Sequence, residues 1–307
     1  MRDRIEYWAV IAARAVVSLL PISFVRFLGT LLGLTFYAVD AVHRRIADTN
    51  LVTAFPARSR AERRAIVRQM FVHFGRLLLE LLKFSTLSPD QMRRVVEFEG
   101  EDRLRAAYAQ GKGVLFFTGH FGYWELQAIV QGLRGEPTAV LARALDNPRL
   151  HALLEQVRTS TGNTVIYRQG AVRRVLKVLH ARQAVAMLID QHMHSPDAIY
   201  VDFFERPAAT TSMLAALAMR TGAPVVPVFA LPLPHGRYRM IYEPAVVPPA
   251  PDSPDAVREF TQRCTDVLEM YVRRYPSLWL WMHRRWRDAP LPPAPGMFPP
   301  ARADEEA

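Results

Sequence analysis

The chain has 307 residues, of which 50% are hydrophobic and 22% are charged, and its formal net charge is +10. This balance excludes a disordered chain and a simple bundle of membrane helices, and it indicates one large domain with appendages and a basic surface. The single cysteine, Cys264, excludes an internal disulfide framework and a cysteine-based zinc site. Its helical spacing with apolar neighbours predicts a buried position in a reducing, cytoplasm-facing body.

Arginine supplies almost all of the positive charge, because lysine occurs only at Lys83, Lys112 and Lys177. The planar guanidinium suits bidentate binding of phosphate or carboxylate. We therefore expect an anionic membrane surface, and no nucleic acid, among the partners. A compositional bias of the source genome is the alternative explanation for most of these arginines.

Residues 7–42 form the most apolar stretch of the chain. Charges and a proline interrupt it at Arg14, Pro21, Arg26 and Asp40. The longest uncharged run, 27–39, is shorter than the roughly 18 residues of a clean membrane span, so we predict a helical hairpin that dips into one leaflet. The basic residues 43–45 would then face anionic headgroups on the cytoplasmic side. For this N-terminal region, 1–45, the alternative is an ordinary buried helix pair.

From residue 46 to residue 287 the chain is predicted to form one α/β domain. A long amphipathic helix over 57–83 comes first, and short apolar strands then alternate with helices. Predicted strands cover 113–119, 138–143, 163–167, 184–190, 223–231 and 237–247, and predicted helices begin near 123, 146, 170, 210 and 254. Such alternation predicts a mainly parallel central sheet with helices on both faces. The proline-rich tail, 288–307, is predicted to be unstructured.

The most informative motif is a histidine followed five positions later by a glutamate, in a turn after the strand predicted at 113–119. Five residues turn a straight helix through about 500°, so the pair fits better if His120 precedes the helix and Glu125 occupies its first turn. Gly119 and Gly122 would allow the tight path. Glu125 would then hold one ring nitrogen of His120, while the other takes a proton from a hydroxyl or amine. The alternative is that His120 caps the helix and Glu125 complements its dipole.

A general base needs a nucleophile to activate. The sequence contains no G-x-S-x-G motif, and Cys264 is predicted to lie in the core. The second substrate itself is therefore the predicted nucleophile, which favours direct acyl transfer to an acceptor hydroxyl without a covalent acyl-enzyme.

Polar residues also follow other predicted elements. Arg143 and Asp190 come at the ends of strands, and Arg158 comes near the end of a helix. Because the carboxyl ends of parallel strands meet at one edge of a sheet, we expect these residues near His120. An arginine there would stabilise an oxyanion or hold a phosphate. The alternative for each arginine is a solvated charge at the end of a helix.

The loop after Asp190 also permits a metal-site interpretation. Its candidate ligands are Asp190, His192, His194 and Asp197. The spacing lacks a recognisable third histidine, so the sequence favours a site with no metal and no other cofactor.

Seven separated segments carry a family resemblance. They are NLVTAFP (50–56), GHFGYWE (119–125), ARALDNPRL (142–150), IDQ (189–191), VDFFERPAATT (201–211), GAPVVPVF (222–229) and LWLWMHRRWR (278–287). By their order and spacing, the chain resembles the late acyltransferases of lipid A synthesis, the lauroyl and myristoyl transferases of the Gram-negative envelope, within the glycerolipid acyltransferase superfamily. The resemblance runs from about residue 5 to residue 287.

This resemblance implies that His120 is the catalytic base with Glu125 as its partner, and that Arg158 and Asp190 are further activity-critical residues. It implies transfer of a fatty acyl chain from acyl carrier protein, or less often from a coenzyme A thioester, to a hydroxyl of a lipid A precursor. It also implies an N-terminal anchor at the cytoplasmic face of the inner membrane.

Substrate contacts are predicted from the turn glycines 119 and 122, from Arg143 and from the last segment. There, Arg284 and Arg285 are predicted to meet phosphate, while Trp279, Trp281 and Trp286 lie at the level of the lipid headgroups. The alternative for this segment is that the tryptophans close the core and the arginines are solvated.

The acceptor stays open at the level of sequence, because relatives of the same build acylate mannosylated phosphoinositides, aminolipids or lysophospholipids. Two other functions compete with acyl transfer. One is a thioesterase in which water replaces the acceptor. The other is a peripheral protein that binds anionic lipid through its arginines and apolar hairpin.

Overall fold

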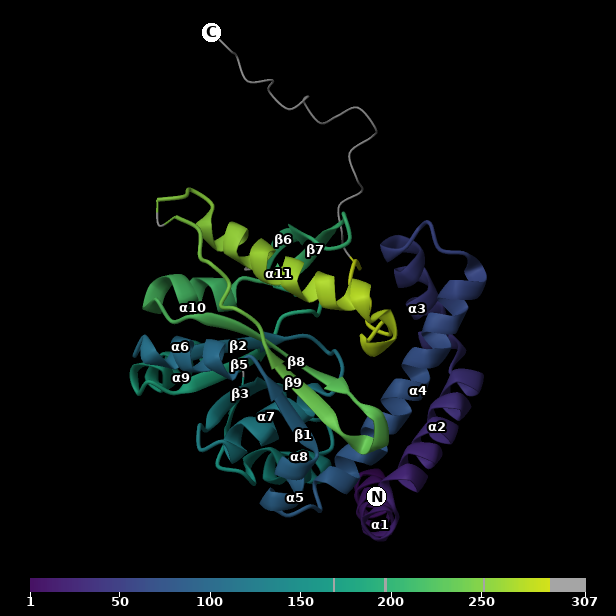
Figure 1. Cartoon of the computed structure of the whole chain (residues 1–307). Coiled ribbons are helices and arrows are strands. Elements are labelled where there is room, and N and C mark those ends of the chain that lie inside the picture. Colours follow the sequence, from purple (N-terminus) through teal and green to yellow (C-terminus); the bar gives the residue numbers. More distant parts are fainter. Residues whose placement is uncertain (168, 196–197, 251, 288–307) are drawn as a thin grey trace.

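A seven-stranded sheet forms the centre of the protein in the computed structural model (Figure 1). The structure describes residues 1–167, 169–195, 198–250 and 252–287. The strands are β1 (Val96–Glu99), β2 (Val114–Thr118), β3 (Thr138–Ala142), β4 (Thr164–Tyr167), β5 (Ala184–Leu188), β8 (Val225–Pro232) and β9 (Tyr238–Tyr242), in the order β1-β9-β8-β2-β5-β3-β4. Neighbouring strands are parallel except for the antiparallel pair β8 and β9. The predicted mainly parallel α/β sheet is confirmed.

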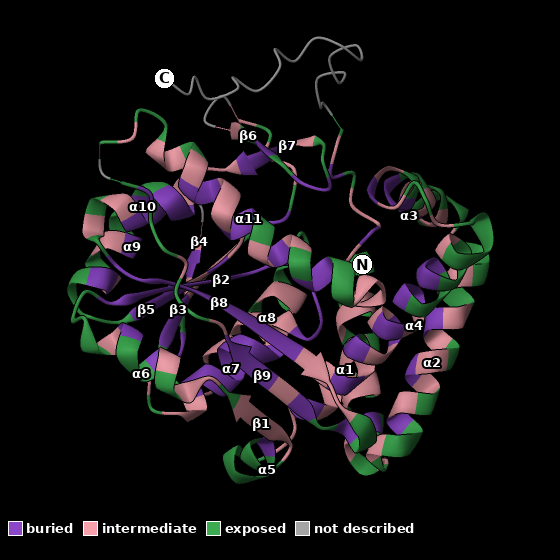
Figure 2. Cartoon of the chain, turned by 45° about the horizontal axis from the view of Figure 1, so that its top comes forward, coloured by how far each residue is buried: buried purple, intermediate pink, exposed green. Residues whose placement is uncertain are grey.

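Helices cover both faces of this sheet (Figure 2), because alternate residues of a strand point to opposite faces. In β2, Leu115 and Phe117 pack into one hydrophobic core, and Val114 and Phe116 pack into the other. The first core includes α9 (Ala171–His180), α10 (Met213–Thr221) and α11 (Ala256–Arg274), and the second includes α5 (Pro89–Arg94), α6 (Glu101–Ala109) and α7 (Trp124–Leu133). Cys264 of α11 lies in the first core and is a buried free thiol, as predicted.

Four helices precede the sheet. They are α1 (Arg2–Leu19), α2 (Ile22–Val39), α3 (Ala41–Ala54) and α4 (Arg60–Phe84). Helix α2 lies along α4 at the distance of backbone contact (Figure 1). A Cβ atom on Gly33 would lie 2.3 Å from the Phe71 carbonyl oxygen, and one on Gly75 would lie 2.4 Å from the Gly29 oxygen. Only glycine fits at these positions.

This close contact leaves the bulky side chains of the first two helices on the outside. Exposed apolar residues include Ile5, Trp8, Val16, Leu19, Phe24, Phe27, Leu31, Phe36 and Val39. Helix α2 is long and apolar enough to cross a membrane, and only 17% of it is buried, so it is not an ordinary core helix. The uncharged run 27–39 underestimates its apolar length because Arg26 turns inward to Glu80, with 3.4 Å between their charged groups. The predicted break at Pro21 separates α1 from α2.

Two strand features were not predicted from the sequence. The first is the short edge strand β1. The second is the hairpin of β6 (Ala198–Asp202) and β7 (Pro207–Thr211), which occupies the start of the helix predicted from residue 210. Its turn places Phe204 and Glu205 at φ +56° and +59°, a conformation usually given to glycine or asparagine, so the sequence carried no turn signal there. The predicted unstructured tail, 288–307, lies outside the described residues.

Candidate active site

The candidate site lies where β2 and β5 end side by side at the carboxyl edge of the sheet. His120 follows β2 and Asp190 follows β5. The backbone N–H of His120 donates to Oδ2 of Asp190 at 2.6 Å. Gly119 makes this approach possible, because a Cβ atom there would lie 2.9 Å from the same oxygen. The predicted convergence of these strand ends brings His120 and Asp190 together.

Asp190 also holds the imidazole of His120. The Nδ1 atom of His120 lies 2.9 Å from Oδ1 of Asp190, and the indole Nε1 of Trp279 donates to Oδ2 at 2.8 Å. Although burial opposes ionisation of this carboxyl, the His120 ring and these hydrogen bonds lower the pKa of Asp190 to about 2. An ionised Asp190 makes Nδ1 the protonated nitrogen, which leaves Nε2 as the acceptor. Nε2 lies 3.2 Å from the side-chain nitrogen of Gln191, which can donate to it.

The charges around the imidazole favour its protonated form. Burial of the ring works against protonation, but the carboxylates of Asp190 and Glu125 outweigh it and raise the pKa of His120. A raised pKa makes the neutral imidazole a stronger base.

The turn that carries His120 is fixed from three sides. Gly122 has φ +56°, and a Cβ atom on it would lie 2.1 Å from the carbonyl oxygen of Ala230 in β8. Its N–H donates to the carbonyl of Leu278 at 2.9 Å, and its own carbonyl lies 3.2 Å from Nε2 of His73 in α4. Burial lowers the pKa of His73 to about 4, so its ring is neutral and donates from Nε2. Gly122 thus serves the turn by its backbone, as predicted for a tight path.

Glu125 does not hold the imidazole, which corrects the predicted pairing. It lies in the first turn of α7, as expected, but its carboxylate binds Arg158 at the end of α8 (Pro148–Thr159). The two hydrogen bonds run from Nε at 2.9 Å and from Nη2 at 2.5 Å. Both side chains are mostly buried, with 16% and 12% exposed. A guanidinium fork satisfies both carboxylate oxygens at once, so Glu125 acts on His120 by its charge across the site.

The predicted contact of Arg285 with phosphate needs correction. Arg285 is 1% exposed, and it donates to the Ala209 carbonyl and to the Thr210 hydroxyl, both at 2.6 Å. It lies inside the protein and does not present its charge to a phosphate at the surface. Arg284 is exposed, and Arg143 is exposed beside Asp146. Within the described residues, no hydrogen bond or ion pair joins either of these two to His120.

The tryptophans of the last segment pack into or against the hydrophobic core. Trp279 is 1% exposed and Trp281 is 0% exposed, and their rings pack edge to face. Trp286 is partly buried and stacks on Phe203. The predicted position at headgroup level is wrong for Trp279 and Trp281. The hydrogen bond from Trp279 to Asp190 was not predictable from local sequence patterns, because 89 residues separate the two.

The loop after Asp190 does not assemble a ligand set within the described residues. There and elsewhere in this part of the chain, no three side chains of the His, Cys, Asp and Glu types are placed so that they could hold a metal ion. His192 and His194 pack against each other with ring centroids 4.4 Å apart. Asp197 lies outside the described residues.

The fold and this geometry place the protein among α/β enzymes whose site lies at the carboxyl edge of a parallel sheet. The chain matches the family of bacterial lipid A biosynthesis acyltransferases over residues 1–288, and it belongs to this family. It is therefore an O-acyltransferase.

The sequence is similar to those of named relatives over most of their length. The chain is 28% identical to the lipid A biosynthesis lauroyltransferase of Escherichia coli over 92% of both chains. It is 26% identical to the myristoyltransferase of the same organism, over 90% of this chain and 84% of the relative. A phosphatidylinositol mannoside acyltransferase of Mycobacterium tuberculosis is 25% identical over 69% of this chain and 67% of the relative.

Proposed function

We propose that the protein moves a fatty acyl chain from a thioester donor, acyl carrier protein or coenzyme A, to a hydroxyl of a lipid A precursor. The observation that carries the proposal is the orientation of His120. Asp190 occupies its Nδ1 atom, so Nε2 points away as the one ring nitrogen available to a substrate. The family match and the two Escherichia coli relatives support lipid A as the acceptor.

In the proposed reaction, Nε2 of His120 takes the proton of the acceptor hydroxyl as its oxygen attacks the thioester carbonyl. The tetrahedral oxyanion collapses, the carbon–sulfur bond breaks, and the protonated imidazole returns the proton to the leaving thiolate. Asp190 stabilises the imidazolium throughout, as a buried carboxylate does beside a catalytic histidine. Gln191 now occupies the Nε2 position and has an exposed side chain, so it is free to yield to the acceptor hydroxyl.

The ion pair of Glu125 and Arg158 is assigned to the stabilisation of the oxyanion. Its two hydrogen bonds engage Nε and Nη2 of Arg158, which leaves Nη1 for a substrate oxygen. A donor held in place by an ion pair costs little reorganisation when charge develops on the oxyanion.

We further propose that the first two helices anchor the protein at the cytoplasmic face of the inner membrane. The exposed apolar side chains of α1 and α2, here called the apolar flank, would face the lipid, and α2 has the length of a span. An enzyme whose acceptor stays in the bilayer gains from such an anchor. The net charge of +10 also suits an acidic carrier protein and a phosphorylated acceptor.

The test combines lipid mass spectrometry with purified protein. Lipids are compared from cells that lack the protein, cells with it restored, and cells given His120→Ala, with the exposed His180→Ala as a matched control. We expect a lipid A species heavier by one acyl chain in the restored and control cells only. Purified protein with acyl carrier protein and coenzyme A thioesters then identifies the donor. Full activity of His120→Ala would refute the mechanism.

Two outcomes separate the competing functions. A mass shift in a glycolipid, an aminolipid or a phospholipid would leave the chemistry in place and replace the acceptor, and the Mycobacterium tuberculosis relative motivates a search for that outcome. Release of free fatty acid without any acylated lipid would favour the thioesterase.

A further inference from the structure

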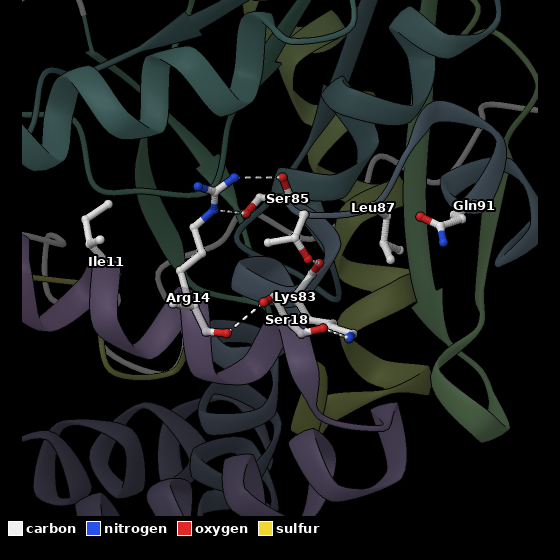
Figure 3. A pocket seen from close by; sticks show the side chains of 9 residues that line it. Ile11, Arg14, Ser18, Lys83, Ser85, Leu87 and Gln91 are labelled. Carbon is white, nitrogen blue, oxygen red and sulfur yellow. Dashed lines mark hydrogen bonds between the residues drawn. The ribbon is translucent and has the colours of Figure 1, made fainter.

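A cavity of about 570 Å³ lies between α1 and the junction of α4 with α5 (Figure 3). Arg14 and Ser18 line it from α1, and Lys83 and Ser85 line it from the opposite side. None of the residues assigned to the acyl transfer site lines this cavity.

The two cations of the cavity are held by neutral atoms. Arg14 donates to the hydroxyl of Ser85 at 2.9 Å and to its carbonyl at 3.1 Å, and Lys83 donates to the carbonyl of Ser18 at 2.7 Å. Figure 3 shows Arg14 reaching from α1 to Ser85, while Lys83 reaches back to α1. In the described part of the chain, neither cation forms an ion pair with a carboxylate. Two positive charges in one partly buried cavity repel each other until an anion enters.

Hydrogen-bond donors remain available on both cations. A guanidinium has five N–H groups, of which Arg14 uses two, and an ammonium has three, of which Lys83 uses one. A planar fork beside a compact ammonium suits the oxygens of a phosphate group. The anion that fits this chemistry is a phosphate ester.

The surroundings of the cavity identify the source of that phosphate. Ile11 and Leu87 give it an apolar wall. On the same helix, Val16 and Leu19, which belong to the apolar flank, are 55% and 87% exposed. An anion that approaches from this flank carries acyl chains.

We propose that this cavity binds the phosphate of an anionic glycerophospholipid and so fixes the orientation of the enzyme on the membrane. The lipid source rests on the proposed membrane function, whereas the phosphate chemistry rests on the cavity itself. A zwitterionic choline lipid fits less well, because its quaternary ammonium would lie beside two cations.

The test measures flotation of the full-length protein with phosphatidylcholine vesicles that contain or lack phosphatidylglycerol. The variant Arg14→Gln/Lys83→Gln removes both positive charges from the cavity. The control Arg105→Gln/Lys112→Gln removes the same two charges near α6, which lies across the molecule from α1 (Figure 1). We expect the cavity variant to bind phosphatidylglycerol vesicles about ten-fold more weakly, and the control to stay within about two-fold of the wild type. Equal losses in both would overturn the proposal in favour of bulk attraction.

Further measurements keep the result interpretable. The wild type on phosphatidylglycerol vesicles is expected to gain hydrogen-exchange protection over 11–18 and 83–91, and absence of that protection would count against the site even if the variant failed to fold. Lys83→Arg should retain binding because it keeps the charge. Inorganic phosphate that displaced the vesicles at millimolar concentration would assign the cavity to free phosphate instead.

His120→Ala separates the two proposals. It should bind vesicles like the wild type while losing acyl transfer. Loss of binding in the cavity variant, together with full activity of His120→Ala, would refute the proposed reaction and leave the lipid site in place.

Discussion

His120 and Asp190 are joined by two hydrogen bonds, one from the backbone N–H and one from Nδ1 of the histidine, each to a different oxygen of the same carboxylate. The first bond fixes the position of the residue and the second fixes the tautomer of its ring. Trp279 holds that carboxylate from the other side. The glutamate of the motif acts from a distance, and the aspartate of a different strand makes the contact.

The dependence of activity on pH tests this division of roles. In the proposed reaction the imidazole starts neutral, so kcat/KM is expected to fall as pH drops through the raised pKa of His120. Asp190→Asn removes a charge that raises this pKa, so the acid limb should move to lower pH while kcat falls by about 10³-fold or more. A pH profile of kcat/KM for both proteins measures the shift. An unmoved acid limb would contradict the assignment of Asp190.

The ion pair of Glu125 and Arg158 predicts a non-additive mutant cycle. Removal of one partner leaves the other buried charge unpaired, so Glu125→Gln and Arg158→Gln should each lower the free energy of unfolding by roughly 3 kcal/mol. The double variant should lose less than the sum, because no unpaired charge remains. Urea unfolding of the four proteins gives the coupling. If the two losses simply add, the pair does not exist in solution.

The turn at Gly122 predicts a difference between two glycine substitutions. Gly111 and Gly122 both have positive φ, but a Cβ atom on Gly111 meets nothing within 4 Å, whereas one on Gly122 meets the Ala230 oxygen at 2.1 Å. Gly111→Ala should cost about 1 kcal/mol from backbone conformation alone. Gly122→Ala should cost more and also displace His120, so that activity is lost in whatever protein remains folded. Thermal unfolding and turnover of both variants, measured side by side, test this.

The apolar flank predicts that membrane association and folding can be separated. Phe27 is 54% exposed and Leu31 is 45% exposed. Phe27→Lys/Leu31→Lys should therefore change stability by no more than about 0.5 kcal/mol per site, while membrane association falls sharply because charges resist burial in lipid. The control Gln110→Lys/Gln183→Lys adds the same charge at exposed positions shortly before the central strands β2 and β5. Cell fractionation and vesicle flotation report the outcome, and an unchanged membrane fraction would remove this flank from the proposed anchor.

Much of the fold follows from the sequence because apolar periodicity reports burial directly. The runs that became β2, β3, β4, β5, β8 and β9 were all predicted as strands, and so was the edge at which His120 and Asp190 meet. The hairpin of β6 and β7 was missed because its turn uses Phe204 and Glu205 in a left-handed conformation. Packing of the surrounding aromatic rings sustains that turn, and single-sequence patterns do not record it.

The candidate site was predictable in its members but not in its pairing. The spacing predicted that Glu125 pairs with His120. In the structure, both residues instead bind partners that are distant in sequence: Asp190 binds the His120 ring, and Arg158 binds Glu125. Each contact joins residues from different elements: His120 and Asp190 follow β2 and β5, and Glu125 and Arg158 lie on α7 and α8. The burial of Arg285 has the same origin, because its carbonyl and hydroxyl acceptors come from the unpredicted strand β7.

Cys264 gives the protein a practical property. It is the only thiol in the chain, it is 1% exposed, and burial raises its pKa to about 12, so no reactive thiolate is present at neutral pH. We therefore expect the folded protein not to react with maleimide reagents. A cysteine introduced on α1 or α2 would be the single labelling position, and its reactivity with and without vesicles would map, residue by residue, which surface meets lipid.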